Sequence, residues 1–559
     1  MKKVIVILII LSLIFISFFA FKKEEEKANK NISVILETEE GNIESNTFPS
    51  KEDYEYLSTE CKNTSDNINT TFNEETWKLN LNVEEERIDG KFNCTVHFKE
   101  NIKPNEPVLD ENMIPVYYSE EDSTWKVADK ENKSTEHKWY DYEEKMWANS
   151  VTVKSEKREE YKTGSLGTKI KMEDILTMQV WIPRYKYKVW NYNLDGTKTS
   201  EPQEIEIKFE EGTNTTGDIK CTDNIQGEDG DGTSEVCTIN NEECSDSLCN
   251  GEYYTHPAFT FGSVDLTGFW VGKFEAGTTS TCIPATPTLY GEGCNITSIS
   301  VLTKPNIKSW NGAMLGVYNN NITKMKDNNN IYGFTNLLDA HVIKNNEWGA
   351  VAYLSHSKFG SSSKVELNSN ENYITGCGPQ IKGDLSSGSV CNSYDTEIGS
   401  SASTTGNIYG VYDMSGGAWE YVMGAIVSPD GKTMMSGYKT SADQHSGFTG
   451  LIYETGNYTN TDGYFTFPEE KYYDKYSYSL SSIDRKRSKL GDAIREPYLI
   501  GDSSWYNGYS KLHFTEFPWL MRGGGAKSGR MATIFTSYQV TGRAVAEYGT
   551  RISIVVNNN

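Results

Sequence analysis

Apolar and polar residues alternate over short runs in the N-terminal part of the chain, and this pattern predicts β-strands. Every second residue is apolar in residues 77–83, and the same period returns in residues 92–98 and 114–117. Because successive side chains of a strand point to opposite faces, such runs indicate strands with one buried face. We expect them to form a small, mainly β domain over residues 53–164.

The aromatic residues near the end of this region allow two interpretations. Residues 139–142 and 147–149 together contain two Trp and two Tyr. Such a cluster forms either the core of the small domain or a platform on which sugar rings stack.

A helical period appears in residues 345–355. Its apolar and small residues recur at i, i+3, i+4 and i+7, starting from Trp348. Glu347 lies where the first turn of a helix favours negative charge, and Gly360 provides a stop. We therefore predict a helix here, capped by one of the two asparagines that open it.

The N-terminus carries an apolar run that can anchor the chain in a membrane. Residues 4–21 contain no charged residue and are flanked by two lysines on each side. The run is longer than the core of a secretory signal, about 7–15 residues, and is near the lower limit of roughly 17–25 residues for a spanning helix. We expect an uncleaved signal anchor over residues 1–22, followed by a polar stalk over residues 23–52. A cleaved signal peptide is the alternative.

The ten cysteines predict local disulfides. They lie in polar segments, without the CxxC pairs or His clusters of zinc sites, and their even number is typical of an oxidising compartment. Reduced thiols in a cytosolic protein are the alternative. Short loop closure favours pairing of neighbours, which gives Cys61–Cys94, Cys221–Cys237, Cys244–Cys249, Cys282–Cys294 and Cys377–Cys391. With the anchor, these bonds place the bulk of the chain outside the cell.

Composition narrows the class of partner. The formal net charge is −24, which argues against nucleic acid because phosphate binding needs a basic surface. The 34 Tyr, 21 Phe and 12 Trp indicate a folded protein and suit an aromatic recognition surface. An acidic insertion over residues 212–251 includes EDGDG at 228–232. That run lacks the spacing and the bidentate Glu of a calcium-binding EF-hand, so we expect a solvated loop.

Four blocks in the C-terminal part carry a family resemblance. Residues 344–353 read KNNEWGAVAY, residues 406–421 read GNIYGVYDMSGGAWEY, residues 522–525 read RGGG, and residues 549–556 read GTRISIVV. In this order they resemble the formylglycine-generating enzyme, or sulfatase-modifying factor, family, whose signatures are LPTEAEWEYAA, GLYDMxGNVWEW, RGGS and a terminal GFR strand. The resemblance implies an α+β fold class, with a C-type lectin-like domain over residues 165–559. In that scaffold we expect Trp419 to be a core residue.

The chain departs from this family where the family does its chemistry. The copper-binding enzymes use two cysteines shortly after RGGS, but residues 526–535 contain no Cys. The related iron enzymes need three His ligands, and the seven His of this chain are scattered. We therefore expect no catalysis. A divergent formylglycine-generating-like or hydrolytic enzyme is the alternative, with Asp413 and Glu420 as its paired carboxylates.

The resemblance also implies a calcium site and a ligand surface. The family's Glu in WEW is similar to a calcium ligand, which would place structural calcium at Glu420 with the carbonyls of Gly416 and Ala418. No other cofactor is expected. Non-catalytic surface proteins with this fold bind ligands between the RGGS-like block and the terminal strand. The corresponding candidates here are Lys527, Arg530, Thr536, Tyr538, Gln539 and Arg543, with Trp505, Tyr506 and Tyr509 as a neighbouring aromatic wall. Ordinary exposed loops are the alternative.

These observations favour a single-pass, membrane-anchored extracellular protein that binds or adheres to an unidentified protein or glycan. A structural envelope or pilus-like subunit, in which the aromatic N-terminal domain makes subunit contacts, is the alternative.

Overall fold

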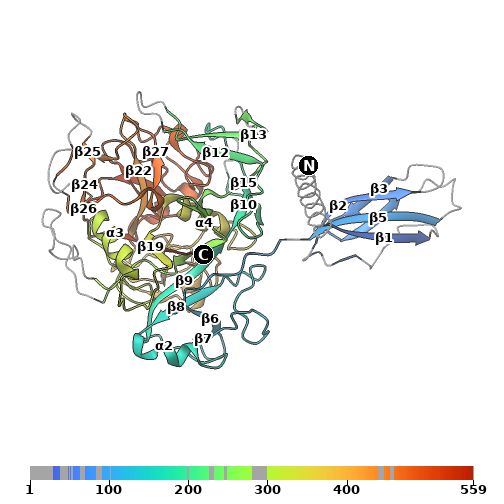
Figure 1. Cartoon of the computed structure of the whole chain (residues 1–559), viewed down its shortest axis with the longest axis horizontal. Coiled ribbons are helices and arrows are strands. Elements are labelled where there is room, and N and C mark those ends of the chain that lie inside the picture. Colours follow the sequence, from blue (N-terminus) through green and yellow to red (C-terminus); the bar gives the residue numbers. More distant parts are fainter. Residues whose placement is uncertain are drawn as a thin grey trace, which may run out of the picture. The chain divides into compact units, whose positions relative to one another are not determined.

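The computed structural model describes most of the chain as two compact units, Met1–Lys103 and Pro104–Asn559 (Figure 1). The described residues are 29–37, 48–49, 51, 54–62, 69–82, 91–100, 102–197, 201–225, 232–244, 248–279, 299–437, 446–453, 459–461 and 463–557. Among these, no helix combines the length and the apolar character needed to cross a membrane. The predicted anchor and most of the predicted stalk lie outside the described residues.

The N-terminal unit contains a three-stranded antiparallel sheet and a hairpin. The sheet has the order β1-β5-β2, and its strands are β1 (Asn29–Glu37), β5 (Lys91–Glu100) and β2 (Tyr54–Lys62). The hairpin is formed by β3 (Asn69–Asn73) and β4 (Lys78–Asn82). Its Phe72 ring stacks on Tyr56 of β2 at 4.3 Å between ring centres. The two alternating runs predicted in this part of the chain are therefore confirmed as strands β4 and β5.

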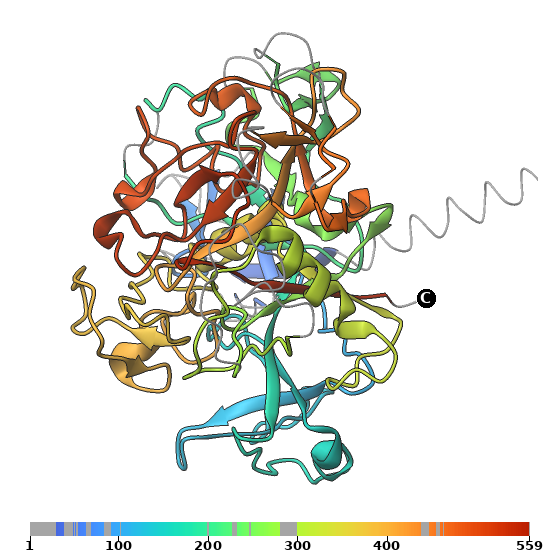
Figure 2. The ribbon, with the colours of Figure 1, turned by 90° about the vertical axis from the view of Figure 1, so that its left-hand side faces the viewer.

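The C-terminal unit contains a seven-stranded sheet. Its order is β19-β31-β18-β9-β8-β6-β7, and every pairing is antiparallel. Its strands are β6 (Ile114–Ser119), β7 (Thr124–Val127), β8 (Asn149–Val153), β9 (Ile175–Pro183), β18 (Gly268–Gly272), β19 (Leu338–Val342) and β31 (Ile552–Val556). The β6–β7 hairpin lies at one end of the unit, beside helix α2 (Ser155–Lys162), in both views (Figures 1 and 2).

A second sheet of five strands carries the end of the block 406–421, which we call the central motif block. Strands β27, β22, β28 and β29 lie in that order, and β30 also pairs with β22. Their bounds are β22 (Trp419–Ile426), β27 (Asp474–Tyr476), β28 (Trp519–Arg522), β29 (Ser537–Val540) and β30 (Tyr548–Thr550). The chain's last segment thus contributes β30 to this sheet and, directly afterwards, β31 to the seven-stranded sheet.

The remaining strands form small sheets. Two have three strands: β10 (Tyr185–Lys188) with β11 (Ile207–Phe209) and β15 (Tyr253–Thr255), and β12 (Ile219–Asp223) with β13 (Glu235–Ile239) and β14 (Glu242–Glu243). The two-stranded ones pair β16 (Thr260–Phe261) with β17 (Val264–Asp265), β20 (Cys377–Gly378) with β21 (Asn392–Ser393), β23 (Met435–Gly437) with β25 (Ile452–Tyr453), and β24 (Phe448–Thr449) with β26 (Phe465–Thr466).

Within the described residues, helices are few and short. The α-helices after α2 are α3 (Leu315–Thr323), α4 (Asn345–Ser355) and α5 (Glu397–Ser400). The 3-10 turns are η1 (Pro257–Phe259), η2 (Lys324–Lys326), η4 (Glu470–Tyr472), η5 (Arg485–Arg487), η6 (Trp505–Asn507) and η7 (Gly529–Met531). Helix α4 confirms the helix predicted at these residues. Its N-cap is Lys344, whose backbone N–H donates to the Glu347 carboxylate at 2.9 Å, instead of either asparagine.

The expected fold class, α+β with a C-type lectin-like domain and an N-terminal transmembrane helix, is wrong for the described structure. The chain is mainly β, with 33% strand and 11% helix, and its strands are divided among many small sheets. The physical reason lies in the turns. Many glycines and asparagines adopt positive φ, which favours chain reversal after a few residues, and the α-helices of the described residues are no longer than 11 residues.

The boundary between the units also differs from the one expected at residues 164/165. Strand β8 is buried along its whole length, because β6 and β9 flank it on both sides. Residues 114–153 consequently belong to the sheet of the C-terminal unit. The aromatic cluster there lies in the core: Trp139, Tyr142 and Trp147 are each no more than 2% exposed.

Four of the five predicted disulfides are present: Cys61–Cys94, Cys221–Cys237, Cys244–Cys249 and Cys377–Cys391. The first two join facing residues of paired strands, in the β2–β5 and β12–β13 ladders. The fifth pair, Cys282 and Cys294, lies outside the described residues, as does most of the EDGDG run.

Candidate functional site

The central motif block is joined to the terminal strand by a buried ion pair. Both side-chain oxygens of Glu420 accept from the guanidinium of Arg551, at 2.7 and 3.1 Å, and neither residue is exposed. Arg551 also donates to the backbone carbonyls of Gly272 and Tyr412. Burial raises the pKa of Glu420 to about 7, although Arg551 lowers it. The pair ties β22 to the end of the chain.

Ala418 of the predicted calcium element, together with its neighbour Gly417, faces a second carboxylate, that of Glu275. The backbone N–H of Ala418 donates to Glu275 Oε1 at 2.8 Å. Gly417 has φ +67°, and a Cβ placed there would lie 2.2 Å from the same oxygen. Glycine at this position, where the family has Asn, thus leaves room for Glu275. Calcium at Gly416, Ala418 and Glu420 stays a prediction, and an ion there would compete with Arg551 for the Glu420 oxygens.

Asp413 and Glu420, the paired carboxylates of the enzyme alternative, are both held by protein donors. Asp413 Oδ1 accepts from Asn368 Nδ2 at 2.8 Å and from the Gly376 N–H at 2.9 Å, and the residue is 1% exposed. Burial raises its pKa, although Arg551 lowers it. Buried, hydrogen-bonded carboxylates of this kind are typical of a structural role.

The predicted ligand residues fall into three environments. Lys527 and Arg530 are exposed, at and beside η7. Tyr538 and Gln539 on β29, and Arg543 in the following loop, are partly exposed, whereas Thr536 is buried. Trp505 is fully buried and stacks on Trp190 at 5.3 Å, so it belongs to the core and cannot form an exposed wall. Tyr506 is partly exposed and its hydroxyl lies 2.6 Å from His356 Nε2.

The structure instead brings three partly exposed rings together, which we call the aromatic row: Trp419, Tyr538 and Tyr509. Trp419 is the first residue of β22. Tyr538 lies in β29 of the same sheet, which is separated from β22 by β28, and Tyr509 follows η6. The ring centre of Tyr538 lies 5.8 Å from that of Trp419 and 5.7 Å from that of Tyr509. The row therefore joins the block 406–421 to the loops where ligand residues were predicted.

Neighbouring residues fix the row and leave its polar groups available. A Cβ on Gly525 would lie 3.0 Å from Trp419 Cδ1, so the glycine-rich block packs directly against the indole edge. Lys511 Nζ lies 5.6 Å from the Tyr538 ring centre and 3.4 Å from Asp502. Within the described part of the chain, the Trp419 indole N–H and the Tyr509 and Tyr538 hydroxyls have no hydrogen-bond partner.

Sequence reasoning missed Trp419 as a surface residue because an isolated Trp in an apolar strand is usually a core residue. Its place as the first residue of β22, followed by seven buried ones, is what leaves it partly exposed. Strand alternation places Trp419 and Tyr421 on one face and Glu420 on the other. This pattern assigns the faces of the strand, but it does not indicate which end of the strand is exposed to solvent.

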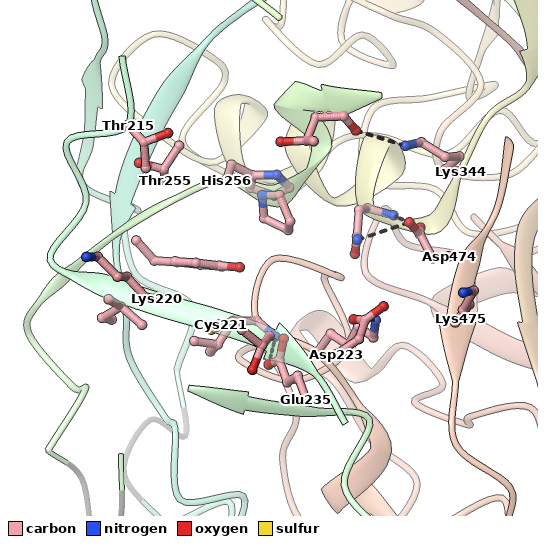
Figure 3. Close-up of a pocket in the computed structure, with 18 of the residues that line it drawn as sticks. Thr215, Lys220, Cys221, Asp223, Glu235, Thr255, His256, Lys344, Asp474 and Lys475 are labelled. Carbon is pink, nitrogen blue, oxygen red and sulfur yellow. Dashed lines mark hydrogen bonds and ion pairs between the residues drawn. The ribbon is translucent and has the colours of Figure 1, made fainter. Parts of the chain in front are cut away.

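A separate cavity of about 490 Å³ lies among β12, β15, β27 and the start of α4 (Figure 3). Lys344 and Asp474 lie on one side of it, and Thr255 and Lys220 on the other. His256 also lines it, and burial lowers the pKa of His256 to about 3, so the ring is neutral. None of the residues predicted as ligand contacts lines this cavity.

No known family model matches the chain, and no curated protein matches it.

Proposed function

We propose that the chain is an extracellular, membrane-anchored binding or adhesion protein that uses the aromatic row as its recognition surface and has no catalytic activity. The resemblance of its motif blocks to the formylglycine-generating enzyme family supports a scaffold role for those blocks. The alternative of a structural subunit has no specific observation in its favour.

The observation that carries the proposal is the availability of the three rings. Each ring combines an apolar face with a polar N–H or O–H that has no hydrogen-bond partner among the described residues. Residues of this kind contribute most to binding where they are held in place by packing, and Trp and Tyr are enriched among such anchors. The glycine-rich block and β28 hold Trp419 and Tyr538 in place, which lowers the entropy lost on binding.

The absence of catalysis is supported by the hydrogen bonds and the ion pair that hold the two candidate catalytic carboxylates. Asp413 and Glu420 are buried and bonded to protein donors, and the stretch after RGGG has no cysteine. The extracellular location is supported by the four disulfides, since such bonds persist in oxidising compartments. The charge-free run at residues 4–21 supports the anchor.

An array of glycans and surface proteins, probed with the purified full chain, tests the proposal. We expect a ligand whose binding is weakened by Trp419→Ala and by Tyr538→Ala. Tyr464→Ala is the matched control, because Tyr464 is 45% exposed and lies outside the row. Equal binding by all three variants would show that recognition lies elsewhere. Copper-dependent oxygen consumption with a cysteine peptide would show an enzyme instead.

A further inference from the structure

The cavity of Figure 3 contains one buried cation whose hydrogen-bonding capacity is largely unused. Lys344 is 5% exposed, yet its ammonium makes a single long hydrogen bond, 3.4 Å, to the Thr260 carbonyl. It also lies 5.5 Å from the centre of the Phe261 ring. It forms no ion pair with a carboxylate of the described residues. An ammonium has three donors, so at least one remains for a bound molecule.

Three other buried charges that line the cavity form ion pairs, whereas the buried Asp474 accepts hydrogen bonds from the Asn346 backbone N–H and side-chain amide. Arg184 binds Glu210 at 3.1 Å, Glu235 binds Arg495 at 3.0 Å, and Lys489 binds Asp223 at 2.5 Å. Leaving a buried charge without a partner is costly, and native structures do so rarely. Among the buried Lys and Arg side chains that line the cavity, Lys344 is the one without an ion pair to a described carboxylate.

A second unused group lies two residues away. Asn346 is 7% exposed, and its Nδ2 donates to Asp474 Oδ1 at 3.1 Å, which fixes the orientation of the amide. Asn346 Oδ1 is buried and has no hydrogen-bond partner among the described residues. Lys344 and Asn346 both line the cavity, so its wall includes a cation with spare donors and an amide oxygen without a described partner.

Further charged groups modulate the site. The ammonium of Lys471 lies 5.4 Å from the same Phe261 ring, so it and Lys344 approach one ring, and Lys471 also pairs with Asp339 at 3.3 Å. Asp474 is a buried acid on this side of the cavity, where burial raises its pKa and the nearby Lys344 lowers it. Glu347 is engaged with His341 and with the Lys344 backbone.

We propose that this cavity is a binding site for a small hydroxylated carboxylate of the size of a sugar acid. The ligand carboxylate binds the Lys344 ammonium, and a ligand hydroxyl donates to Asn346 Oδ1. The volume of 490 Å³ lies within the usual range for small-molecule sites, roughly 300–1,000 Å³. The site is independent of the aromatic row, because neither Trp419, Tyr509 nor Tyr538 lines it.

Calorimetric titration of the full chain with three probes tests the chemistry. We expect D-glucuronate to bind and both D-glucose and inorganic phosphate to bind about tenfold more weakly, because glucose lacks the charge and phosphate lacks the sugar hydroxyls. Glucose binding as tightly as glucuronate would overturn the role of Lys344. Phosphate binding as tightly would overturn the role of the hydroxyl, and a chain that binds none of the three would overturn the site.

Variants locate the binding. Lys344→Met keeps the length of the side chain and removes its charge, and we expect it to weaken glucuronate binding about tenfold or more. Lys432→Met is the control, since Lys432 is exposed and does not line the cavity. If Lys344→Met does not fold, Lys471→Met at the rim is expected to weaken binding about threefold by removing the second ammonium. Unchanged affinity in a folded Lys344→Met or Lys471→Met variant would overturn the assignment.

Discussion

Trp505 is enclosed by aromatic side chains in the core of the C-terminal unit. Its indole lies 5.3 Å from Trp190, 5.4 Å from Phe535 and 5.2 Å from the His356 ring, and no part of it is exposed. Removing a side chain of this size leaves a cavity that its neighbours cannot fill.

We therefore expect Trp505→Ala to lower the free energy of unfolding by about 3–5 kcal/mol. Chemical denaturation of the variant measures this change. Tyr506→Ala is the neighbouring control, and its effect is expected to be smaller because Tyr506 is partly exposed. Equal, small effects in both variants would contradict the core position of Trp505.

Glu496 is a buried acid that holds two tyrosines. Its carboxylate accepts from the hydroxyls of Tyr187 and Tyr353 and from the Gly491 N–H. Burial, together with the nearby Asp492, raises the pKa of Glu496 from 4.5 to about 7. The folded state thus favours the protonated acid, so the stability from this group is complete below pH 4.5 and is lost as the pH rises through about 7.

Glu496→Gln resembles the protonated acid at every pH, so we expect wild type to lose stability relative to this variant as the pH rises. The difference in unfolding free energy should change by about 3 kcal/mol between pH 4.5 and neutral pH. Urea titrations of both proteins across this range provide the comparison. A difference that stays constant with pH would mean that the acid titrates normally.

At the scale of elements, helix α4 is positioned by a glycine. Gly349 lies in the helix interior, where alanine is ordinarily more stable by roughly 0.5–1 kcal/mol. Here a Cβ on Gly349 would lie 1.9 Å from the backbone oxygen of Gly491, a contact that backbone atoms cannot relieve by changing rotamer. The helix therefore packs directly against the backbone of the 489–495 loop.

Gly349→Ala is expected to lower the free energy of unfolding by roughly 1–3 kcal/mol, because the cost of overpacking exceeds the gain in helix propensity from alanine. Glu159→Ala in α2 is a control at an exposed helix position, where the change should be near zero or slightly stabilising. Thermal melting of the two variants makes the comparison. A more stable Gly349→Ala protein would contradict the close approach of α4 to this loop.

The sequence predicts those elements whose stabilising contacts are local in sequence, and it does not predict features that depend on distant residues. The period of residues 345–355 is local, and α4 forms at those residues. The cysteines of each pair are close in sequence, so short loop closure predicts four bonds that are present, and two of these join facing residues of adjacent strands. Whether Trp419 and Trp505 lie in the core or at the surface depends on long-range packing. Trp505, for example, packs against Trp190, which is far away in sequence, and no local sequence pattern reveals such a contact.

At the scale of the whole molecule, the boundary between the two units also depends on long-range contacts. Strands β6 and β7 alternate like those of the N-terminal unit, but β6 pairs with β8 and β8 pairs with β9, so all three belong to the larger sheet. The C-terminal unit begins at Pro104. A local period cannot distinguish two sheets that have the same alternation.

We expect a chain that begins at residue 104 to melt at the same temperature as the C-terminal unit within the full protein. A chain that begins at residue 165 lacks β6, β7 and β8 and exposes one long side of β9, so it should fail to fold. Circular dichroism melting curves test both. Cooperative, unchanged unfolding of the shorter chain would contradict the seven-stranded sheet.

The central claim is that the aromatic row recognises a ligand while the residues beneath it hold the fold. Its most direct test is the affinity of Tyr538→Ala for the ligand found on the array, measured together with the variant's melting temperature. We expect affinity to fall by about 1–3 kcal/mol while the melting temperature stays close to that of wild type. Wild-type affinity in a folded Tyr538→Ala protein would contradict the claim.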